Sequence, residues 1–264
     1  MSAQPSTLTG RCMYIWKLRP VLLSEMGVNT FVKKAKKAKL SSVWIKVAEG
    51  ASEYSNITGT MEAQFREVRQ KLEDEGIAVW GWHVPFCKTT HDAKAEAKLV
   101  SRIAQDFNLN GVLMDAESEA VFFKGTAETA STYASELRKL LNAQSKGLGI
   151  SSHDIPGNFP GFPFDAFAEH ATVNAPQVYY GTSPSVGNRL DNAIKANRHL
   201  NIPFVPVGAG WLGGGGGCPS ASVCGERAII FMKLVREHEF PGYSFWHWQG
   251  APSKLWEVLF TEPV

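Results

Sequence analysis

Short apolar runs alternate with longer stretches of helical periodicity along the whole chain. The runs are rich in β-branched and aromatic residues, and each has the length of a single strand. Eight of them occur, at residues 12–17, 42–48, 77–83, 111–115, 148–152, 173–180, 203–209 and 243–248. Because nearly every position in them is apolar, they predict the strands of a parallel sheet covered by helices.

The segments between the runs place apolar residues three and four positions apart. The clearest of them aligns Ala130, Tyr133, Ala134, Leu137, Leu140 and Leu141 on one helical face. This spacing predicts amphipathic helices that pack against the sheet.

Eight strand–helix units in about 250 residues are typical of a closed (β/α)8 TIM barrel, an α/β fold. An open, doubly wound sheet is the alternative that the same alternation allows. No interdomain linker is visible, so we expect a disordered arm at residues 1–11 and one barrel domain at residues 12–264. The Pro/Gly-rich segments 153–165 and 208–220 follow strands, which predicts loops at the rim where barrels place their active sites.

Composition and charge narrow the function classes. Apolar residues make up 44% of the chain and charged residues 20%, which predicts a packed core. A formal net charge of +2 argues against nucleic acid or an anionic membrane as the main partner. No apolar run reaches the ~20 residues that span a bilayer, and the N-terminus lacks the pattern of a secretory signal. We therefore expect synthesis in the cytoplasm without membrane insertion.

The segment "GVLMDAE", residues 111–117, places two acids at the end of a buried run. Alternation along a strand puts Leu113, Asp115 and Glu117 on one face, so both carboxyls would point into the mouth of a barrel. A carboxyl crowded by a second one has a raised pKa, which suits a general acid. The alternative is a pair of solvated loop acids.

Four motifs resemble those of family 25 glycoside hydrolases, the barrel lysozymes that cut peptidoglycan. They are "WIKVAEG" (44–50), "GWHVPF" (81–86), "MDAE" (114–117) and "FWHWQG" (245–250), in order and at barrel spacing. The resemblance implies a lysozyme-like hydrolase in which Glu117 is the general acid. Asp115 would orient or stabilise the charge that develops in the reaction. One departure is that the first strand, "YIWKLRP", lacks the Asp that ends this strand in the family.

A weaker similarity links the chain to family 18 chitinases. That family also ends its fourth strand in Asp-x-Glu, with a Tyr after strand six and a Trp on strand eight. Gln177, Tyr179 and Trp246 stand at the corresponding places. The additional Asp residues that precede the family 18 Asp-x-Glu are missing here.

Further residues at strand ends are candidates for substrate binding. Glu49 would accept hydrogen bonds from sugar hydroxyls or pair with Lys46, and His83 would line the floor of the mouth. Their alternatives are a solvated cap and a satisfied core histidine. His153 and Asp154 follow strand five and are weaker candidates for the same role.

The glycine run "GAGWLGGGGG" (208–217) predicts a flexible lid that carries Trp211 against the sugar. A phosphate site is the alternative for a loop after strand seven, but the loop contains no Lys or Arg. Cys218 and Cys224 in the same loop are expected to be able to form a disulfide, with two unrelated thiols as an equal alternative. No metal-type Cys/His spacing or nucleotide motif occurs, so we expect no metal and no cofactor.

These observations predict a glycoside hydrolase that cleaves a β-linked N-acetylhexosamine polymer, in the first place peptidoglycan. The alternatives are a family 18-like chitinase, a sugar-binding barrel without catalysis, and a barrel enzyme for a phosphorylated metabolite. Without a signal peptide, such a lysozyme would reach a cell wall after lysis, by phage delivery or by dedicated secretion.

Overall fold

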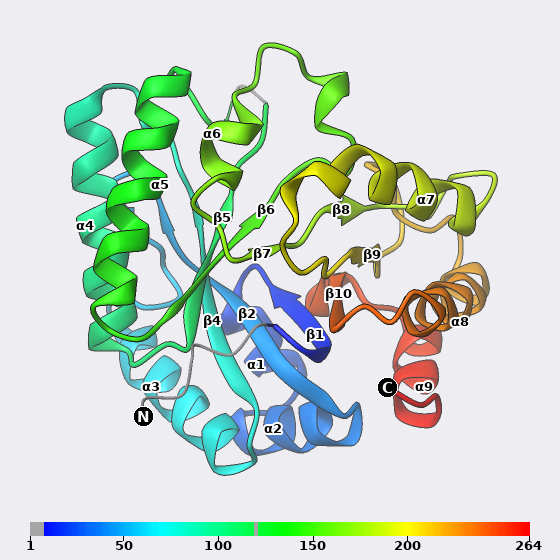
Figure 1. The fold of residues 1–264 in the computed structure, drawn as a ribbon. Coiled ribbons are helices and arrows are strands. Elements are labelled where there is room, and N and C mark those ends of the chain that lie inside the picture. The colour runs from blue at the N-terminus through cyan, green and yellow to red at the C-terminus, as the bar shows by residue number, and fades with distance from the viewer. Residues whose placement is uncertain (1–7, 119–120) are drawn as a thin grey trace.

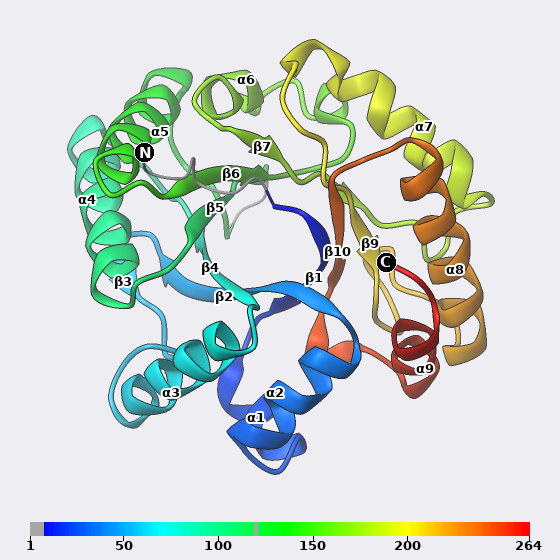
Figure 2. The same ribbon diagram turned by 60° about the horizontal axis from the view of Figure 1, so that its bottom comes forward.

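A computed structural model describes residues 8–118 and 121–264, and it confirms the α/β barrel (Figure 1). Parallel strands form a closed ring, and helices cover its outside (Figure 2). The barrel strands are β1 (Gly10–Ile15), β2 (Leu40–Glu49), β4 (Ala78–Val84), β5 (Gly111–Asp115), β6 (Gly147–Ser151), β7 (Val173–Asn174), β8 (Gln177–Val178), β9 (Val207–Ala209) and β10 (Gly242–Trp246). A short β3 (Ser52–Glu53) pairs with β2 at the rim.

The ring closes through one irregular strand, residues 173–178. Its first half, β7, pairs with β6, and its second half, β8, pairs with β9. Single bridges from Asn174 to Phe204 and from Gln177 to His153 extend both pairings. Because this segment joins the two ends of the sheet, the alternative of an open, doubly wound sheet is wrong.

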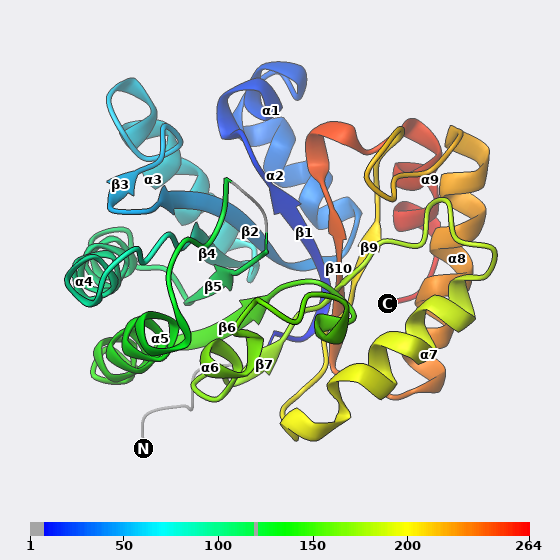
Figure 3. The same cartoon turned by 90° about the horizontal axis from the view of Figure 1, so that it is seen from above.

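The helices lie in a layer around the strands. Figure 3 shows α3, α4 and α5 on one side of the sheet and α7, α8 and α9 on the other. Their bounds are α1 (Leu18–Ser24), α2 (Val28–Lys37), α3 (Thr60–Asp74), α4 (Thr90–Asp106), α5 (Ala127–Asn142), α6 (Phe164–Ala168), α7 (Val186–Asn197), α8 (Ala221–Glu237) and α9 (Ser253–Thr261). Single 3-10 turns lie at η1 (Pro156–Asn158), η2 (Arg198–Leu200) and η3 (Trp248–Gly250).

Side-chain caps and apolar faces explain where these helices form. At the start of α5, Thr126 and Thr129 bond each other's backbone N–H groups in a capping box, which satisfies donors that lack partners within the helix. The apolar face predicted for α5 is buried against the sheet and against α4, except that Leu140 is only half-buried.

A tryptophan fills the lower part of the barrel interior. Trp80 on β4 is 1% exposed, and its indole lies beside Gly111 and Gly147, the first residues of β5 and β6. A Cβ atom at either glycine would overlap the ring. The barrel is therefore packed solid below its mouth, which leaves the carboxyl ends of the strands as the place for a site.

The predicted boundary of the N-terminal arm is corrected by the structure. β1 begins at Gly10, and both Leu8 and Arg11 are buried. The Arg11 guanidinium donates to the carbonyl of Ala38 and to the Tyr243 hydroxyl, which ties this end of the chain to the barrel. Residues 1–7 of the predicted arm lie outside the described residues.

Within residues 8–118 and 121–264, none of the helices combines the length and the apolar character that crossing a bilayer requires. The same residues contain no group of three or more His, Cys, Asp or Glu placed to hold a metal ion.

Candidate active site

A cavity of about 420 Å³ opens at the carboxyl ends of the barrel strands. Seven of the eight residues predicted for the site line it: Glu49, Asp115, Glu117, Gln177, Tyr179, Trp211 and Trp246. They come from the ends of four strands, β2, β5, β8 and β10, and from the glycine loop, so it is the closure of the barrel that brings them together.

The two predicted catalytic acids are joined by one amide. Asp115 is the last residue of β5, and Glu117 follows it at the rim. The Gln177 side chain, which comes from β8, donates from its Nε2 to Asp115 Oδ1 at 3.1 Å and to Glu117 Oε1 at 2.9 Å. A single nitrogen thus holds both carboxyls on the same side of the cavity.

The protonation of Asp115 follows from its surroundings. The residue is 4% exposed, and burial raises the pKa of its carboxyl well above the ordinary value. The charge of Glu117 and a hydrogen bond between the two side chains raise this pKa further, while Lys46 and Gln177 lower it. Asp115 therefore holds a proton that it donates to Glu117.

Replacement of Asp115 by asparagine is expected to raise the free energy of unfolding at neutral pH. The unfolded carboxyl loses its proton near pH ~4, whereas the folded one keeps it. The contribution of Asp115 to the free energy of unfolding is therefore fully present below the pKa of the unfolded carboxyl. It is lost as the pH rises toward the pKa of the folded one. Asparagine resembles the protonated carboxyl and has no such dependence.

Urea unfolding of Asp115→Asn and of the wild type between about pH 3 and pH 8 measures this effect. The stability difference should be small at the acid end and grow as the pH rises. Asp106→Asn, which removes an exposed carboxyl at the end of α4, measures the contribution of charge removal alone. A difference that does not change with pH would contradict a protonated Asp115.

Hydrogen bonds hold the main chain on both sides of Glu117. Before it, the Ser152 hydroxyl donates to the Ala116 carbonyl at 2.6 Å. After it, the Ser118 N–H donates to His153 Nε2 at 3.1 Å. The segment that follows β6 therefore positions the residue that β5 delivers to the rim.

His153 is suited to accept this bond because it is neutral. Burial lowers the pKa of its imidazole, and the ring stacks on Phe159 with centroids 3.7 Å apart. With Nε2 accepting from Ser118, the ring proton lies on Nδ1. Protonation at low pH would place a second donor against the Ser118 N–H and break the bond.

His153→Phe is expected to lower kcat by up to about tenfold, the value of one hydrogen bond, with little change in KM. Phenylalanine keeps a ring against Phe159 but cannot accept from Ser118. His153→Gln keeps an acceptor and should recover part of the loss. Steady-state kinetics check this, and a rise in KM without a fall in kcat would indicate direct contact with substrate instead.

Tyr179 and Trp211 form the wall beside the acids. Their rings meet edge to face with centroids 4.9 Å apart, and the Trp211 indole N–H donates to the Gly214 carbonyl within the glycine loop. Burial and the charge of Glu117 raise the pKa of the Tyr179 hydroxyl well above its ordinary value. Tyr179 therefore keeps its hydroxyl proton at neutral pH and can donate it in a hydrogen bond.

Tyr14 lies beneath the cavity, and the sequence analysis did not predict it as a site residue. Its ring contacts Trp44, Trp82 and Trp246 with centroids 4.7, 5.9 and 5.3 Å apart. Burial and the nearby Asp115 raise the pKa of its hydroxyl. The alternation of β1 was a usable signal, because Cys12 and Tyr14 share the inward face.

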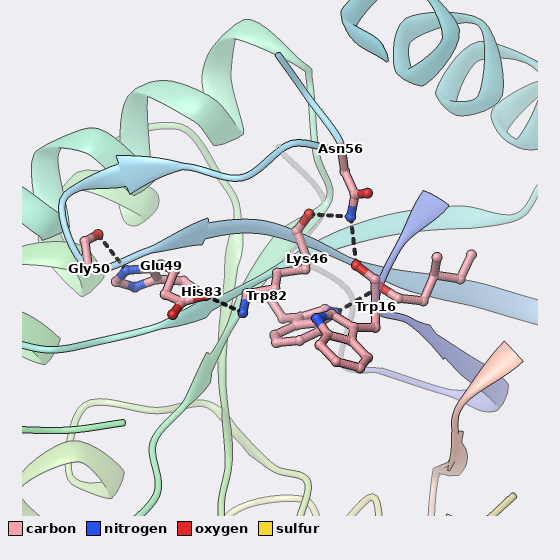
Figure 4. Close-up of polar contacts among 8 residues, drawn as sticks. Trp16, Lys46, Glu49, Gly50, Asn56, Trp82 and His83 are labelled. Atoms are coloured by element: carbon pink, nitrogen blue, oxygen red, sulfur yellow. Dashed lines mark hydrogen bonds and ion pairs between the residues drawn. The ribbon is translucent and has the colours of Figure 1, made fainter. Parts of the chain in front are cut away.

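Glu49 lies on the opposite side of the cavity from Gln177 and pairs with a cation. Lys46 Nζ donates to Glu49 Oε2 at 2.6 Å, as Figure 4 shows. Of the two roles predicted for Glu49, the structure supports the pairing with Lys46. Trp16, Lys46 and Trp82 also line this side and were not among the predicted site residues. Lys46 shares the inward parity of Trp44, which is the signal that could have found it.

The prediction for His83 is corrected by the structure. Its ring is 0% exposed, and its nitrogens bond the Tyr133 hydroxyl at 2.6 Å and the Gly50 carbonyl at 2.9 Å. Burial lowers its pKa to about 3, so it is neutral. His83 faces the helix layer and supports the turn after β2, because Trp82 next to it takes the inward position.

Asp154 lines an adjoining cavity of about 310 Å³ that shares Gln177 and Tyr179 with the first. His153 also lines this second cavity. The Arg189 guanidinium donates to the Asp154 carboxylate at 2.8 Å, so the acid is paired. Whether either residue contacts a substrate stays a prediction.

Cys218 and Cys224 are free and fully buried, and each thiol lies 3.8 Å from the Ala209 carbonyl oxygen. Because both thiols lie against the same carbonyl oxygen, the two side chains are neighbours rather than unrelated residues. Formation of a disulfide between them stays a prediction.

Comparison with known proteins shows which barrels share this fold. Neither the protein-family models nor the curated sequences compared with the chain match it. Among solved structures, a family 18 chitinase from Pseudoalteromonas aurantia is 12% identical, with a TM-score of 0.63 over 94% of this chain and 97% of that one. The spore cortex-lytic enzyme SleL from Bacillus cereus is 10% identical, with a TM-score of 0.64 over 95% and 73%. A chitinase from Chromobacterium violaceum is 11% identical, with a TM-score of 0.58 over 97% and 100%.

The chain thus has the fold of chitinase and cortex-lytic barrels. The sequence resembles family 25 more strongly than family 18. These structures nevertheless agree better with the resemblance to family 18. The family 25 resemblance receives no specific support from them.

Proposed function

We propose that this protein is a glycoside hydrolase that cleaves β-linked N-acetylhexosamine polysaccharides with help from the substrate's own acetamide group. The observation that carries the proposal is the amide of Gln177, which binds Asp115 and Glu117 at once. Two carboxyls held together in this way face the same side of a bound sugar. They cannot protonate the leaving group on one side and attack the anomeric carbon from the other.

The acetamide oxygen of the substrate would take the place of the missing nucleophile. A proton passes from Asp115 to Glu117 along their hydrogen bond and from Glu117 to the leaving glycosidic oxygen. The acetamide oxygen bonds to the anomeric carbon as the glycosidic bond breaks, giving a cyclic oxazolinium ion. Asp115, now an anion, accepts a hydrogen bond from the N–H of this cation and stabilises its charge.

Water completes the reaction. Glu117, now ionised, takes a proton from a water molecule that attacks the anomeric carbon and reopens the ring. Tyr179 donates its hydroxyl proton in a hydrogen bond to the acetamide oxygen and holds it near the anomeric carbon. Trp246 provides a flat apolar surface for the sugar ring. No metal or cofactor enters these steps.

Two natural polymers have the required backbone, chitin and peptidoglycan. Chitinases and a spore cortex-lytic enzyme are among the structures that share this fold, which supports the class of substrate. The muramidase-like activity expected from the family 25 resemblance is one member of this class, and a chitinase-like activity is the other.

A sugar-binding barrel without catalysis is the second candidate. It is favoured by β1, whose end carries Trp16 and no acid, and by Leu113, a leucine two residues before Asp115 on the same inward face. Release of reducing ends from chitin oligosaccharides and from purified bacterial walls, measured beside co-sedimentation with both polymers, separates the candidates. Binding without reducing ends would favour this second candidate.

A further inference from the structure

We propose that the side of the cavity formed by Trp16, Lys46, Glu49 and Trp82 is a subsite for a sugar unit that carries a carboxylate, which Lys46 binds in place of Glu49. The inference rests on the proposed function and narrows its substrate class. A polymer with free carboxylates on its sugar units, such as peptidoglycan whose lactyl groups carry no peptide, would be favoured over a neutral polymer such as chitin.

The charges that line the cavity are unevenly distributed. Among the described residues that line it, Lys46 is the one with a cationic side chain, whereas Glu49, Asp115 and Glu117 are acids. An anionic substituent beside Glu117 would be repelled. The Lys46 side is therefore where a substrate carboxylate finds an attractive field.

Lys46 is held in place independently of its anionic partner. Its ammonium lies over the rings of Tyr54 and Trp82, 4.6 and 5.1 Å from their centroids. Its backbone carbonyl accepts from Asn56 Nδ2 at 2.9 Å, and the same nitrogen donates to the Trp16 carbonyl at 2.9 Å (Figure 4). The cation would therefore stay in position when its carboxylate partner changes.

Glu49 is the exchangeable half of the pair. Its side chain is 39% exposed, against 8% for Lys46. A displaced Glu49 carboxylate can rotate into water and keep its hydration, which the buried ammonium cannot do. The 2.6 Å contact of the pair also shows that a carboxylate fits against this ammonium.

The neighbouring rings suit a sugar that bears such a group. Trp16, which is 39% exposed, and Trp82 line the same side of the cavity. Indole faces pack against the apolar faces of pyranoses, while a carboxylate on an ether arm of the sugar would reach the ammonium beside them. Neutral N-acetylhexosamine units offer no such group.

Two tetrasaccharides test the inference. One consists of N-acetylglucosamine alone, and the other alternates N-acetylglucosamine with N-acetylmuramic acid whose lactyl carboxylate is free. The quantity measured is the ratio of kcat/KM for the acidic substrate to that for the neutral one. We expect the wild type to favour the acidic substrate and Lys46→Met to lower the ratio about tenfold, the loss of one charge-assisted hydrogen bond.

Matched variants exclude other causes. Lys46→Arg should keep most of the preference, and Glu49→Gln, which removes the competing anion, should raise it. Lys17→Met removes the same charge from an exposed lysine 4.7 Å from the Trp16 ring centroid and should change the ratio less than about twofold. An unchanged ratio in Lys46→Met, or an equal fall in Lys17→Met, would overturn the inference.

Failure of the proposed function gives a different result. In that case the wild type cleaves neither tetrasaccharide. Calorimetric binding of both tetrasaccharides, with and without Lys46→Met, then tests the subsite by itself. Tighter binding of the neutral sugar by the wild type would reject the subsite whatever the catalytic outcome.

Discussion

Glu117→Gln is expected to abolish hydrolysis while leaving the fold and sugar binding intact. Glutamine keeps an oxygen that accepts from Gln177 Nε2, so the contact that holds this side chain is preserved. It has no proton to give to the leaving oxygen, and general acid–base catalysis is worth about 10²–10⁴-fold. Reducing-end assays measure kcat, and calorimetry with an oligosaccharide measures binding.

The matched control for this variant is Glu49→Gln, which neutralises the other half-buried acid of the cavity. It should keep kcat within about tenfold of the wild type on the neutral substrate, because no proton transfer passes through it. If Glu117→Gln keeps more than about a tenth of the activity, Glu117 is not the acid. A loss of activity in Glu49→Gln alone would indicate that Glu49, and not Glu117, is the general acid.

Cleavage is also expected to require a 2-acetamido group on the sugar whose bond breaks. Asp115 and Glu117 share a hydrogen bond and the same amide donor, so neither can act from the far side of the sugar. The acetamide oxygen is the remaining nucleophile in this arrangement. Substrates with a free amine or a hydroxyl at that position should therefore react only at background rates.

Matched oligosaccharides with the three substituents test this requirement, together with a thiazoline that imitates the cyclic intermediate. The thiazoline should inhibit competitively, and it should bind less tightly to Asp115→Ala, which has no carboxyl proton to donate to the ring nitrogen. Comparable cleavage of the three sugars, or no inhibition by the thiazoline, would reject substrate assistance and make Glu49 the next carboxylate to test as a nucleophile.

The barrel and the core of the site were predictable because both depend on local alternation. A strand directs every second side chain to the same face, so the inward positions of Leu113 and Asp115 follow from the run that contains them. Trp80 and Trp82 face inward, so the same alternation places His83 on the outer face of the barrel. The prediction that His83 contacts the substrate was wrong because it ignored this alternation.

Alternation fails where a strand ends. Trp246 and Trp248 share a face if the last strand continues to residue 248, but β10 ends at Trp246 and η3 begins at Trp248. Trp246 therefore lines the cavity, while Trp248 packs in the helix layer against Phe31. Where a strand stops depends on what covers its end, which no local pattern contains.

The eight repeating units, the inward direction of the two acids and the position of most site residues at strand ends all follow from the order of residues along the chain. These properties depend on neighbours within a few residues. Three further properties depend on how the strands close into a ring: Gln177 binds both acids, burial keeps a proton on Asp115, and Lys46 occupies the opposite side of the cavity. Gln177 lies 62 positions from Asp115 and 60 from Glu117 in the chain. Residues so far apart come into contact only when the ring of strands closes.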